Sequence, residues 1–150
     1  MKVRAATLED AENLASLVRS LAHFYIDQDT DNLPLWLAET LTTSAFERRL
    51  TDDNYVNLVC VIDNKIVGYI ALKEKSHLYH LFVDKNFHGR GIARMLWTSL
   101  SPFLSKSTPT TVRSSVYAVP VYQKLGFIIC GEKATKNGVS FQPMEIKTSP

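Results

Sequence analysis

The sequence has little cysteine and no long apolar run. Cys60 and Cys130 are its two cysteines, and neither stands in a metal-site spacing. We expect both to be reduced thiols in the core, with a disulfide as the alternative. The longest apolar run, Ile66 to Leu72, is far shorter than the roughly 20 residues of a membrane span. Because an apolar leader near Met1 is also missing, we expect a cytoplasmic protein with no membrane partner.

An excess of charge of one sign is missing as well. The 17 Lys and Arg against 15 Asp and Glu leave a formal net charge of +2. Nucleic-acid-binding domains usually show a clustered basic face, so we expect no nucleic-acid partner. The 150 residues are 45 % hydrophobic and 21 % charged, which is typical of a chain that folds. No repeat or Gly/Ser linker divides the sequence, and we expect one domain over residues 1–150.

The spacing of apolar residues in the first third predicts a strand followed by helices. A strand over residues 2–6 leads into a helix that Thr7 caps, with Asp10 as an acidic partner for the free amides. A second helical region is expected in two pieces, the latter with a capping box of Ser44 and Glu47. The apolar stripe of the first helix consists of Ala11, Leu14, Ala15, Val18, Leu21, Ala22 and Tyr25.

From residue 55 the pattern changes to that of strands. Residues 55–62 and 66–72 predict a hairpin, because Asp63 and Asn64 tolerate the left-handed conformation of a tight turn. The remaining predicted elements are a strand at 77–83, a helix marked by Ile92 to Phe103, a strand at 110–115, a helix at 118–125 ended by Gly126, and strands at 127–132 and 139–147. This order indicates an α/β fold with a mixed sheet of about seven strands and about four helices.

The most informative stretch joins the predicted strand at 77–83 to the helix that follows. Gly89 and Gly91 stand at the start of this helix, where glycine lets the backbone approach an anion and free amides point toward it. Arg90, and His88 when protonated, would add positive charge. A phosphate therefore suits this loop, although two glycines before a helix also make an ordinary tight connection. The loop lacks the Gly-Lys-Ser/Thr of a nucleoside-triphosphate site and the three glycines of a dinucleotide site.

The same loop resembles the acetyl-CoA loop of the GNAT superfamily of N-acetyltransferases, whose pattern is Gln/Arg-x-x-Gly-x-Gly/Ala. The matching segment is His88-Gly89-Arg90-Gly91-Ile92-Ala93. Residues 3–10, 63–68 and 118–127, the last ending in Tyr-x-x-x-Gly-Phe, are similar to other segments of that family in order and spacing. The resemblance covers nearly the whole chain and implies a GNAT-type acyl-CoA N-acyltransferase fold.

The resemblance implies a coenzyme site between two strands that splay apart, those at 77–83 and 110–115. Backbone groups at the end of the first strand would pair with the pantetheine arm, and amides of the glycine loop would hold the pyrophosphate. The implied residues are Leu81, Phe82 and Val83 for the arm, and His88, Gly89, Arg90, Gly91, Ile92, Ala93 and Arg94 for the pyrophosphate. His88 stands where the family usually has glutamine or arginine, but a site made mainly of backbone amides should tolerate it.

The resemblance also implies catalytic roles for three side chains. Tyr122 matches the tyrosine that protonates the departing coenzyme A sulfur, with packing in the core as the alternative. Many relatives use a glutamate as base on the strand at 77–83, where this chain has no carboxylate but has His77 and His80. An imidazole with a pKa near ~6.5 suits that task, and a bound water is the alternative. The odd separation of the two histidines would place them on opposite faces of a regular strand unless a bulge intervenes.

The acceptor site is expected from the first two helices and their connection, about residues 24–50. Aromatic and acidic side chains there would make a pocket for a cationic amine, or they belong to the core and a solvated turn. These residues are Phe24, Tyr25, Asp27, Asp29, Asp31 and Trp36. Arg113 stands where the family often has asparagine, and a cation at that place could instead attract an acidic substrate.

These observations lead us to expect a metal-free, acetyl-CoA-dependent N-acetyltransferase. It would move the acetyl group to a primary amine of a small molecule or protein by direct attack on the thioester, because neither cysteine lies in a segment that faces the thioester. One alternative is a non-catalytic acyl-CoA-binding sensor or interaction module of the same fold. Another is a small nucleotide-binding α/β domain. A homodimer through the terminal strands is a further expectation from this fold.

Overall fold

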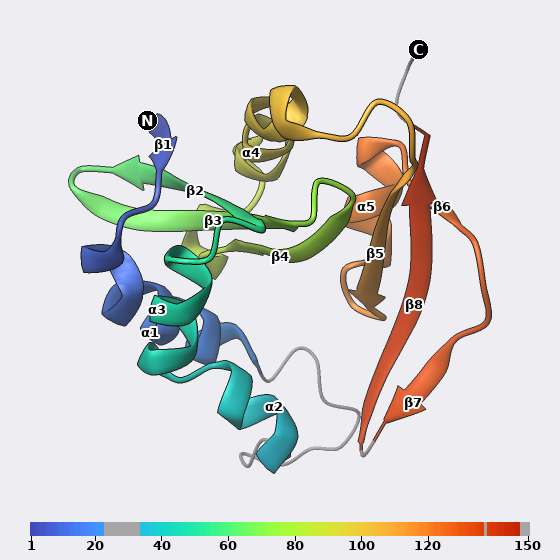
Figure 1. Cartoon of the computed structure of the whole chain (residues 1–150), viewed down its shortest axis with the longest axis horizontal. Helices are drawn as coiled ribbons and strands as arrows, with labels where there is room; N and C mark the ends of the chain where they lie inside the picture. Colours follow the sequence, from blue (N-terminus) through green and yellow to red (C-terminus); the bar gives the residue numbers. More distant parts are fainter. Residues whose placement is uncertain (23–33, 137, 148–150) are drawn as a thin grey trace.

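The computed structural model describes residues 1–22, 34–136 and 138–147 of the chain (Figure 1). In these ranges eight strands form one sheet with the order β1-β2-β3-β4-β5-β8-β6, and β7 pairs with β8. The strands are β1 (Lys2–Ala5), β2 (Tyr55–Ile62), β3 (Lys65–Lys73), β4 (His77–Val83), β5 (Thr110–Ser115), β6 (Ile128–Ile129), β7 (Ala134–Lys136) and β8 (Val139–Ile146). The mixed α/β sheet expected from the sequence is confirmed.

Helices pack against both faces of this sheet. Within the described ranges they are α1 (Ala11–Leu21), α2 (Leu35–Thr40), α3 (Thr43–Leu50), α4 (Ile92–Leu100) and α5 (Val119–Leu125), one more than expected. α1 and α3 lie on one side of β2 and β3, and α4 lies on the other (Figure 1). In the part of the chain that the structure describes, no helix combines the length and apolar character that a bilayer crossing requires.

The two faces of the central strands separate two cores. Leu58 and Cys60 of β2 pack with the buried side chains of α4, whereas Val59 between them packs with those of α1. The same alternation continues on β3, where Ile70 faces α4 and Tyr69 faces α1. Because successive strand residues point to opposite faces, a continuous apolar run serves both cores. The hairpin between β2 and β3 turns at Asp63 and Asn64 as expected, with φ of +50° and +64°.

Gly68 on β3 lets α4 lie close to the sheet. A Cβ at this position would stand 2.9 Å from Cγ2 of Ile92 and 3.0 Å from Cδ1 of Leu96. Real Cβ atoms essentially never come within 3.0 Å of a neighbour, so any residue other than glycine would require these α4 side chains to shift. The close contact positions the first turn of α4, which follows directly on the glycine loop.

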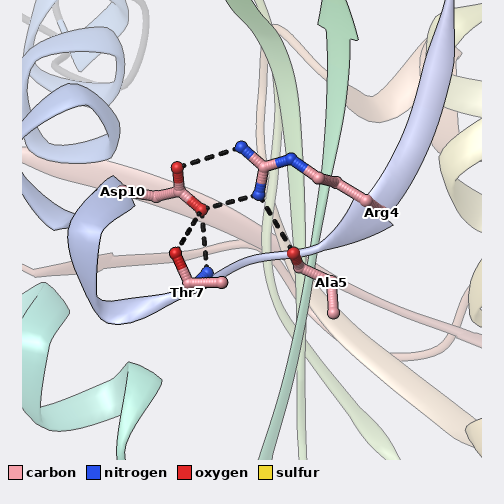
Figure 2. A network of polar contacts seen from close by, with 4 residues as sticks. All are labelled: Arg4, Ala5, Thr7 and Asp10. Atoms are coloured by element: carbon pink, nitrogen blue, oxygen red, sulfur yellow. Dashed lines mark hydrogen bonds and ion pairs between the residues drawn. The ribbon is translucent and has the colours of Figure 1, made fainter.

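The start of the chain is held by the polar network of Figure 2. The Asp10 carboxylate accepts a hydrogen bond of 2.8 Å from the Thr7 backbone N–H, which confirms the expected pairing of these two residues. Arg4 Nη1 donates to the same carboxylate at 2.8 Å, a contact that sequence spacing did not indicate. Hydrogen bonding to Arg4, more than any other contact, lowers the pKa of Asp10. The network ties β1 to the turn η1 (Leu8–Asp10) ahead of α1.

Two expectations about helix ends are wrong. Thr42 rather than Ser44 caps α3, because its side chain accepts a hydrogen bond of 3.1 Å from the Ala45 N–H. Ser44 already lies inside the first turn of that helix. α4 ends at Leu100 instead of reaching Phe103, and the turn η4 (Ser101–Phe103) follows, since Pro102 has no N–H for a further α-helical bond.

The expected strand at 127–132 is also wrong in extent, because only β6 pairs there and β7 begins after a gap. Both strands pair with β8, on either side of Pro143. Proline has no N–H to donate, so the ladder is interrupted at that point. Cys130 lies in this interruption and is exposed, which corrects its assignment to the core; Cys60 is buried as expected. Both are free cysteines.

Candidate active site

β4 and β5 are parallel and separate along their length. In the described chain their backbone pairs are His77 with Thr111 and Leu78 with Val112, both near the start of β4. Beyond them, the described residues form no further pair between β4 and β5. The separation that the family resemblance implied is therefore present. It opens a cavity of about 530 Å³, which we call the larger cavity.

The glycine loop forms one end of the larger cavity. Gly89 and Gly91 have φ of +80° and +75°, a left-handed backbone conformation that residues other than glycine rarely adopt. The Met95 N–H donates to the Gly91 carbonyl at 3.0 Å. The amides of residues 91–94 precede this bond and have no acceptor within α4. Together with the helix dipole, they favour an oxyanion at this end of the cavity.

Polar side chains fix the position of the loop. His88 Nε2 donates to the Val83 carbonyl at 2.8 Å and ties the loop to the end of β4. Arg94 donates from Nη2 to the Lys124 carbonyl, so that α4 is joined to the C-terminal end of α5. The guanidinium of Arg90 instead contacts an aromatic ring and lies 4.9 Å from the centroid of Phe87.

Nine of the ten residues implied for the coenzyme line the larger cavity, and Arg90 does not. The nine are Leu81, Phe82, Val83, His88, Gly89, Gly91, Ile92, Ala93 and Arg94. The sequence reasoning did not assign the opposite wall, which consists of residues from the end of β5 and from α5: Ser115, Tyr117, Ala118, Val121, Lys124 and Leu125. Four of these six lie within the segment 118–127 that resembles the family, which is the signal that could have found them.

A second, smaller cavity of about 300 Å³ adjoins the first. Its walls come from α1, α2, β4, β5, α5, β7 and β8. Residues common to both cavities are Leu81, Phe82, Ser115, Ala118 and Tyr122. Tyr122 is the member of this set with an ionisable side chain. It stands where the two cavities meet.

Tyr122 is both packed and part of the cavity walls. Its side chain is buried, with 6 % of the residue exposed, and its ring meets that of Phe127 nearly edge-on at a centroid distance of 5.5 Å. Burial raises the pKa of the Tyr122 phenol above its ordinary value. The hydroxyl group therefore keeps its proton throughout the neutral range, as a proton donor must.

His77 and His80 both line the smaller cavity. A register shift in the pairing of β3 with β4 leaves Tyr79 without a partner, so that His80 stands opposite Ala71 and His77 opposite Lys73. Ala71 and Lys73 share one face of β3, and so do the two histidines on β4. The bulge named from the sequence as the exception to opposite faces is therefore present.

His80 lies among aromatic rings. Ring centroids of Phe46, Tyr69, Tyr79 and Phe82 are 5.7, 5.7, 4.5 and 5.3 Å from its own. Its Nε2 is buried and has no hydrogen-bond partner among the described residues. Burial, and to a lesser degree the charge of Arg49, hold the pKa of His80 well below its ordinary value. The imidazole is therefore neutral at physiological pH.

His77 is less buried and has a hydrogen-bond partner. Its Nδ1 lies 2.8 Å from Thr111 Oγ1, and that hydroxyl is within 3.4 Å of the Ser76 carbonyl. A hydroxyl that donates to a carbonyl can only accept from Nδ1–H, which leaves Nε2 with a free lone pair. Burial, followed by the charges of Arg113 and Lys73, lowers the pKa of His77.

A family model described as "Acetyltransferase (GNAT) domain" matches residues 21–148 of the chain. The chain belongs to the GNAT acetyltransferase family. No curated protein matches it significantly in sequence. The matched range includes three of the four motif segments, 63–68, 88–93 and 118–127, and the family resemblance is confirmed; residues 3–10 lie outside the match.

Solved structures share the GNAT fold. A GCN5-related N-acetyltransferase from Rhodopseudomonas palustris has a TM-score of 0.81 at 20 % identity, with 98 % of this chain and 95 % of that chain covered. PaiA N-acetyltransferase from Thermoplasma acidophilum, solved in complex with coenzyme A, has a TM-score of 0.79 at 18 % identity, with 98 % of each chain covered. An aminoglycoside 6'-N-acetyltransferase complexed with coenzyme A has a TM-score of 0.71 at 13 % identity, with 100 % and 99 % covered.

The remaining expectations for this GNAT chain concern its acceptor side. Trp36 lies in α2 and lines the smaller cavity, as does Arg113 of β5. Phe24, Tyr25, Asp27, Asp29 and Asp31 lie outside the described residues. The described residues contain no cluster of His, Cys, Asp and Glu side chains that could hold a metal ion.

Proposed function

We propose that residues 1–150 act as one acetyltransferase domain that moves an acetyl group from acetyl-CoA to a primary amine. The observation that carries this proposal is the meeting of two cavities at Tyr122. One cavity begins at a helix N-terminus suited to a pyrophosphate, and the other has two imidazoles in its wall. Two relatives of the same fold were solved with coenzyme A, which supports the choice of donor.

The donor would lie in the larger cavity. The amides of residues 91–94 would hold its pyrophosphate, and backbone groups of β4 from Leu81 to Val83, beyond the last pair with β5, would bind the pantetheine arm as an added strand does. His88 and Arg94 would hold the loop and α5 in place through their bonds to backbone carbonyls. This arrangement would direct the thioester toward Tyr122, where the smaller cavity opens.

The transfer forms one bond and breaks another. The amine nitrogen attacks the thioester carbonyl, a carbon–nitrogen bond forms, and the carbon–sulfur bond breaks. Tyr122 donates its phenolic proton to the departing sulfur, and water in the cavity returns a proton to the phenolate. The proton lost by the amine passes to an imidazole of the smaller cavity. General acid and base groups of this kind each contribute about a hundredfold or more to such reactions.

His80 is our first candidate for the base. It adjoins Leu81, which belongs to both cavities, and its Nε2 has no competing hydrogen bond among the described residues. His77 is the second candidate, because the bond of Nδ1 with Thr111 leaves its Nε2 lone pair free. A water held between them is the third. In each case the group is uncharged at neutral pH and can accept a proton.

Tyr122→Phe tests this proposal, because it removes the hydroxyl group and keeps the ring that packs on Phe127. We expect unchanged acetyl-CoA affinity by calorimetry and a loss of turnover of about a hundredfold in coenzyme A release. Tyr55→Phe removes the hydroxyl group of a β2 residue that lines neither cavity, and as the control it should retain full activity. Unchanged turnover of Tyr122→Phe would overturn the assignment.

A non-catalytic acyl-CoA sensor is the alternative, and the depressed pKa of both histidines favours it because a weak base accepts protons poorly. Release of coenzyme A across a panel of primary amines separates the two functions. A sensor would bind acetyl-CoA with measurable heat and release no coenzyme A with any amine. The absence of binding heat would contradict both functions.

The assembly and location of the protein complete the proposal. Two copies would pair through the terminal part of the sheet, where β6 is an edge strand and exposes Ile128 and Ile129. Light scattering should then give twice the chain mass, and Ile129→Lys should give the monomer. Two free cysteines accord with a cytoplasmic location, where thiols stay reduced.

A further inference from the structure

The smaller cavity presents positive charge and hydrogen-bond donors. Arg113 of β5 and Lys136 of β7 both line it, and its described lining includes no Asp or Glu. In the described chain, ion pairs join Arg4 to Asp10 and Lys65 to Asp84, and neither cavity cation takes part in one. Among the described residues, therefore, no ion pair neutralises the positive charge of this wall.

Aromatic rings hold both cations in place. The Arg113 guanidinium lies 5.7 Å from the centroid of the Phe141 ring, and Lys136 Nζ lies 4.5 Å from that of Trp36. Such contacts position a cation without cancelling its charge. Phe141 and Trp36 themselves line the cavity, so each cation stands at its wall.

Trp36 supplies a further donor. Its Nε1–H is buried and has no hydrogen-bond partner among the described residues. A buried donor without an acceptor costs free energy, and a ligand that supplies an acceptor would recover it. Arginine, lysine and an indole N–H are all donors, and none of them can accept a hydrogen bond. The group that complements this set is an anion with several acceptor oxygens.

We propose that the acceptor substrate is a primary amine that also carries a carboxylate, which Arg113 and Lys136 bind while the amine faces Tyr122. This inference rests on the proposed acetyl transfer. A carboxylate can accept two parallel bonds from a guanidinium and a further one from the ammonium or the indole. An acceptor that bears several positive charges would be repelled from the same wall. The sequence left two acceptors open, a cationic amine and an acidic substrate attracted by Arg113, and this proposal adopts the second.

Matched acceptors of equal length test the proposal. The probes are ω-amino carboxylates from glycine to 6-aminohexanoate, the corresponding n-alkylamines and the corresponding α,ω-diamines. We expect one chain length at which the carboxylate exceeds the alkylamine in kcat/KM by roughly tenfold or more, as a charged hydrogen bond allows, with the diamine last. Equal values for the three classes would overturn the inference and leave acetyl transfer itself in place.

Two variants locate the effect. Arg113→Gln and Lys136→Gln should lower kcat/KM for the preferred amino carboxylate by roughly tenfold and change that for the alkylamine by less than about twofold. Lys133→Gln removes an exposed positive charge just ahead of β7, outside both cavities, and should change neither. A loss that is equal for both acceptors in the two cavity variants would contradict carboxylate binding.

A binding measurement makes the inference testable without turnover. N-acetyl-5-aminopentanoate and N-pentylacetamide resemble the products of the two acceptor classes and differ in the carboxylate. The first should raise the thermal midpoint of the wild-type protein, the second should not, and Arg113→Gln should abolish the difference. If no amine releases coenzyme A and acetyl-CoA gives no heat, the proposed function fails. If the two product analogues act alike, the carboxylate inference fails by itself.

Discussion

His77 and His80 lie on the same face of β4 although their separation in sequence is odd. The unpaired Tyr79 between them shifts the register, so each histidine stands opposite a residue on one face of β3. Both imidazoles consequently line the smaller cavity. A bulge that turns a side chain toward a functional site is a recurrent use of this irregularity. In a regular strand one of the two side chains would point to the opposite face of the sheet, away from the smaller cavity.

The depressed pKa values of these histidines predict the acid limb of the pH profile. A base acts in its neutral form, and both pKa values lie below the usual ~6.5. With saturating amine, kcat should therefore be constant at pH 7 and above. It should fall only at a pH below ~6.5, where the imidazole that acts as base becomes protonated. Rates of coenzyme A release between pH 5 and 8 measure this. A midpoint above pH 7 would exclude both histidines, because burial lowers both pKa values.

Substitution of each histidine assigns the base. His80→Gln should lower kcat by about a hundredfold and remove the acid limb, if His80 accepts the proton. His77→Gln should then retain the acid limb, because its bond with Thr111 has no part in that step. The opposite pattern would transfer the role to His77. Retention of the limb and of activity in both variants would assign the step to water.

Gly91→Ala should weaken coenzyme binding through backbone strain alone. A Cβ there meets no atom within 4 Å, but the φ of +75° is costly for alanine, by about 1–2 kcal/mol. Relief of this strain would turn the amides at the start of α4 and raise the Kd for acetyl-CoA, which calorimetry measures. Gly138→Ala, with a φ of +84° and equally open space, is the matched control. It should lose similar stability and keep the wild-type Kd.

Gly68→Ala should also affect the glycine loop, because Gly68 lies on β3 against the first turns of α4. The added methyl group would overlap Ile92 and Leu96, and overpacking of this kind costs about 1–3 kcal/mol. We expect a lower free energy of unfolding in urea and a weaker Kd for acetyl-CoA. Gly131→Ala meets Pro143 at 3.4 Å, an ordinary contact, and serves as the control. Wild-type stability of Gly68→Ala would contradict the close approach of α4 to β3.

Asp10→Asn should destabilise the start of the chain in a pH-dependent manner. Bonds from Arg4 and Thr7 lower the pKa of Asp10 in the folded state, so its contribution is present above the unfolded value of ~3.9 and is lost as the pH falls through the folded value. Because Arg4 is partly exposed, solvent reduces the effect, and we expect about 1 kcal/mol at pH 7. Urea unfolding at pH 7 and pH 3 measures it. The difference from wild type should shrink at pH 3.

Glu9→Gln is the control for that substitution. Glu9 is exposed, stands next to Asp10 in η1 and carries the same charge. The free energy of unfolding of Glu9→Gln should stay within about 0.5 kcal/mol of wild type at both pH values. Equal losses in the two variants would attribute the effect to net charge and contradict the role of the Arg4 contact.

The sequence by itself determined the features that depend on near neighbours in the chain. The continuous apolar runs of β2 and β3 predict strands, and Asp63 and Asn64 predict the turn that joins them. Two glycines before an amphipathic helix predict an anion loop. These patterns are readable because backbone conformation and side-chain direction repeat over two to four residues. The family motifs are local for the same reason.

Only the tertiary structure decided which distant residues share a surface. Arg113 and Lys136 line one cavity because β5 and β7 both pair with β8, and Tyr79 bulges because β3 holds β4 in a shifted register. Cys130 is exposed because Pro143 of a neighbouring strand interrupts the ladder beside it. Strand pairing joins segments that are far apart in sequence, and no short-range pattern encodes which side chains it brings together. The walls of both cavities are made in this way.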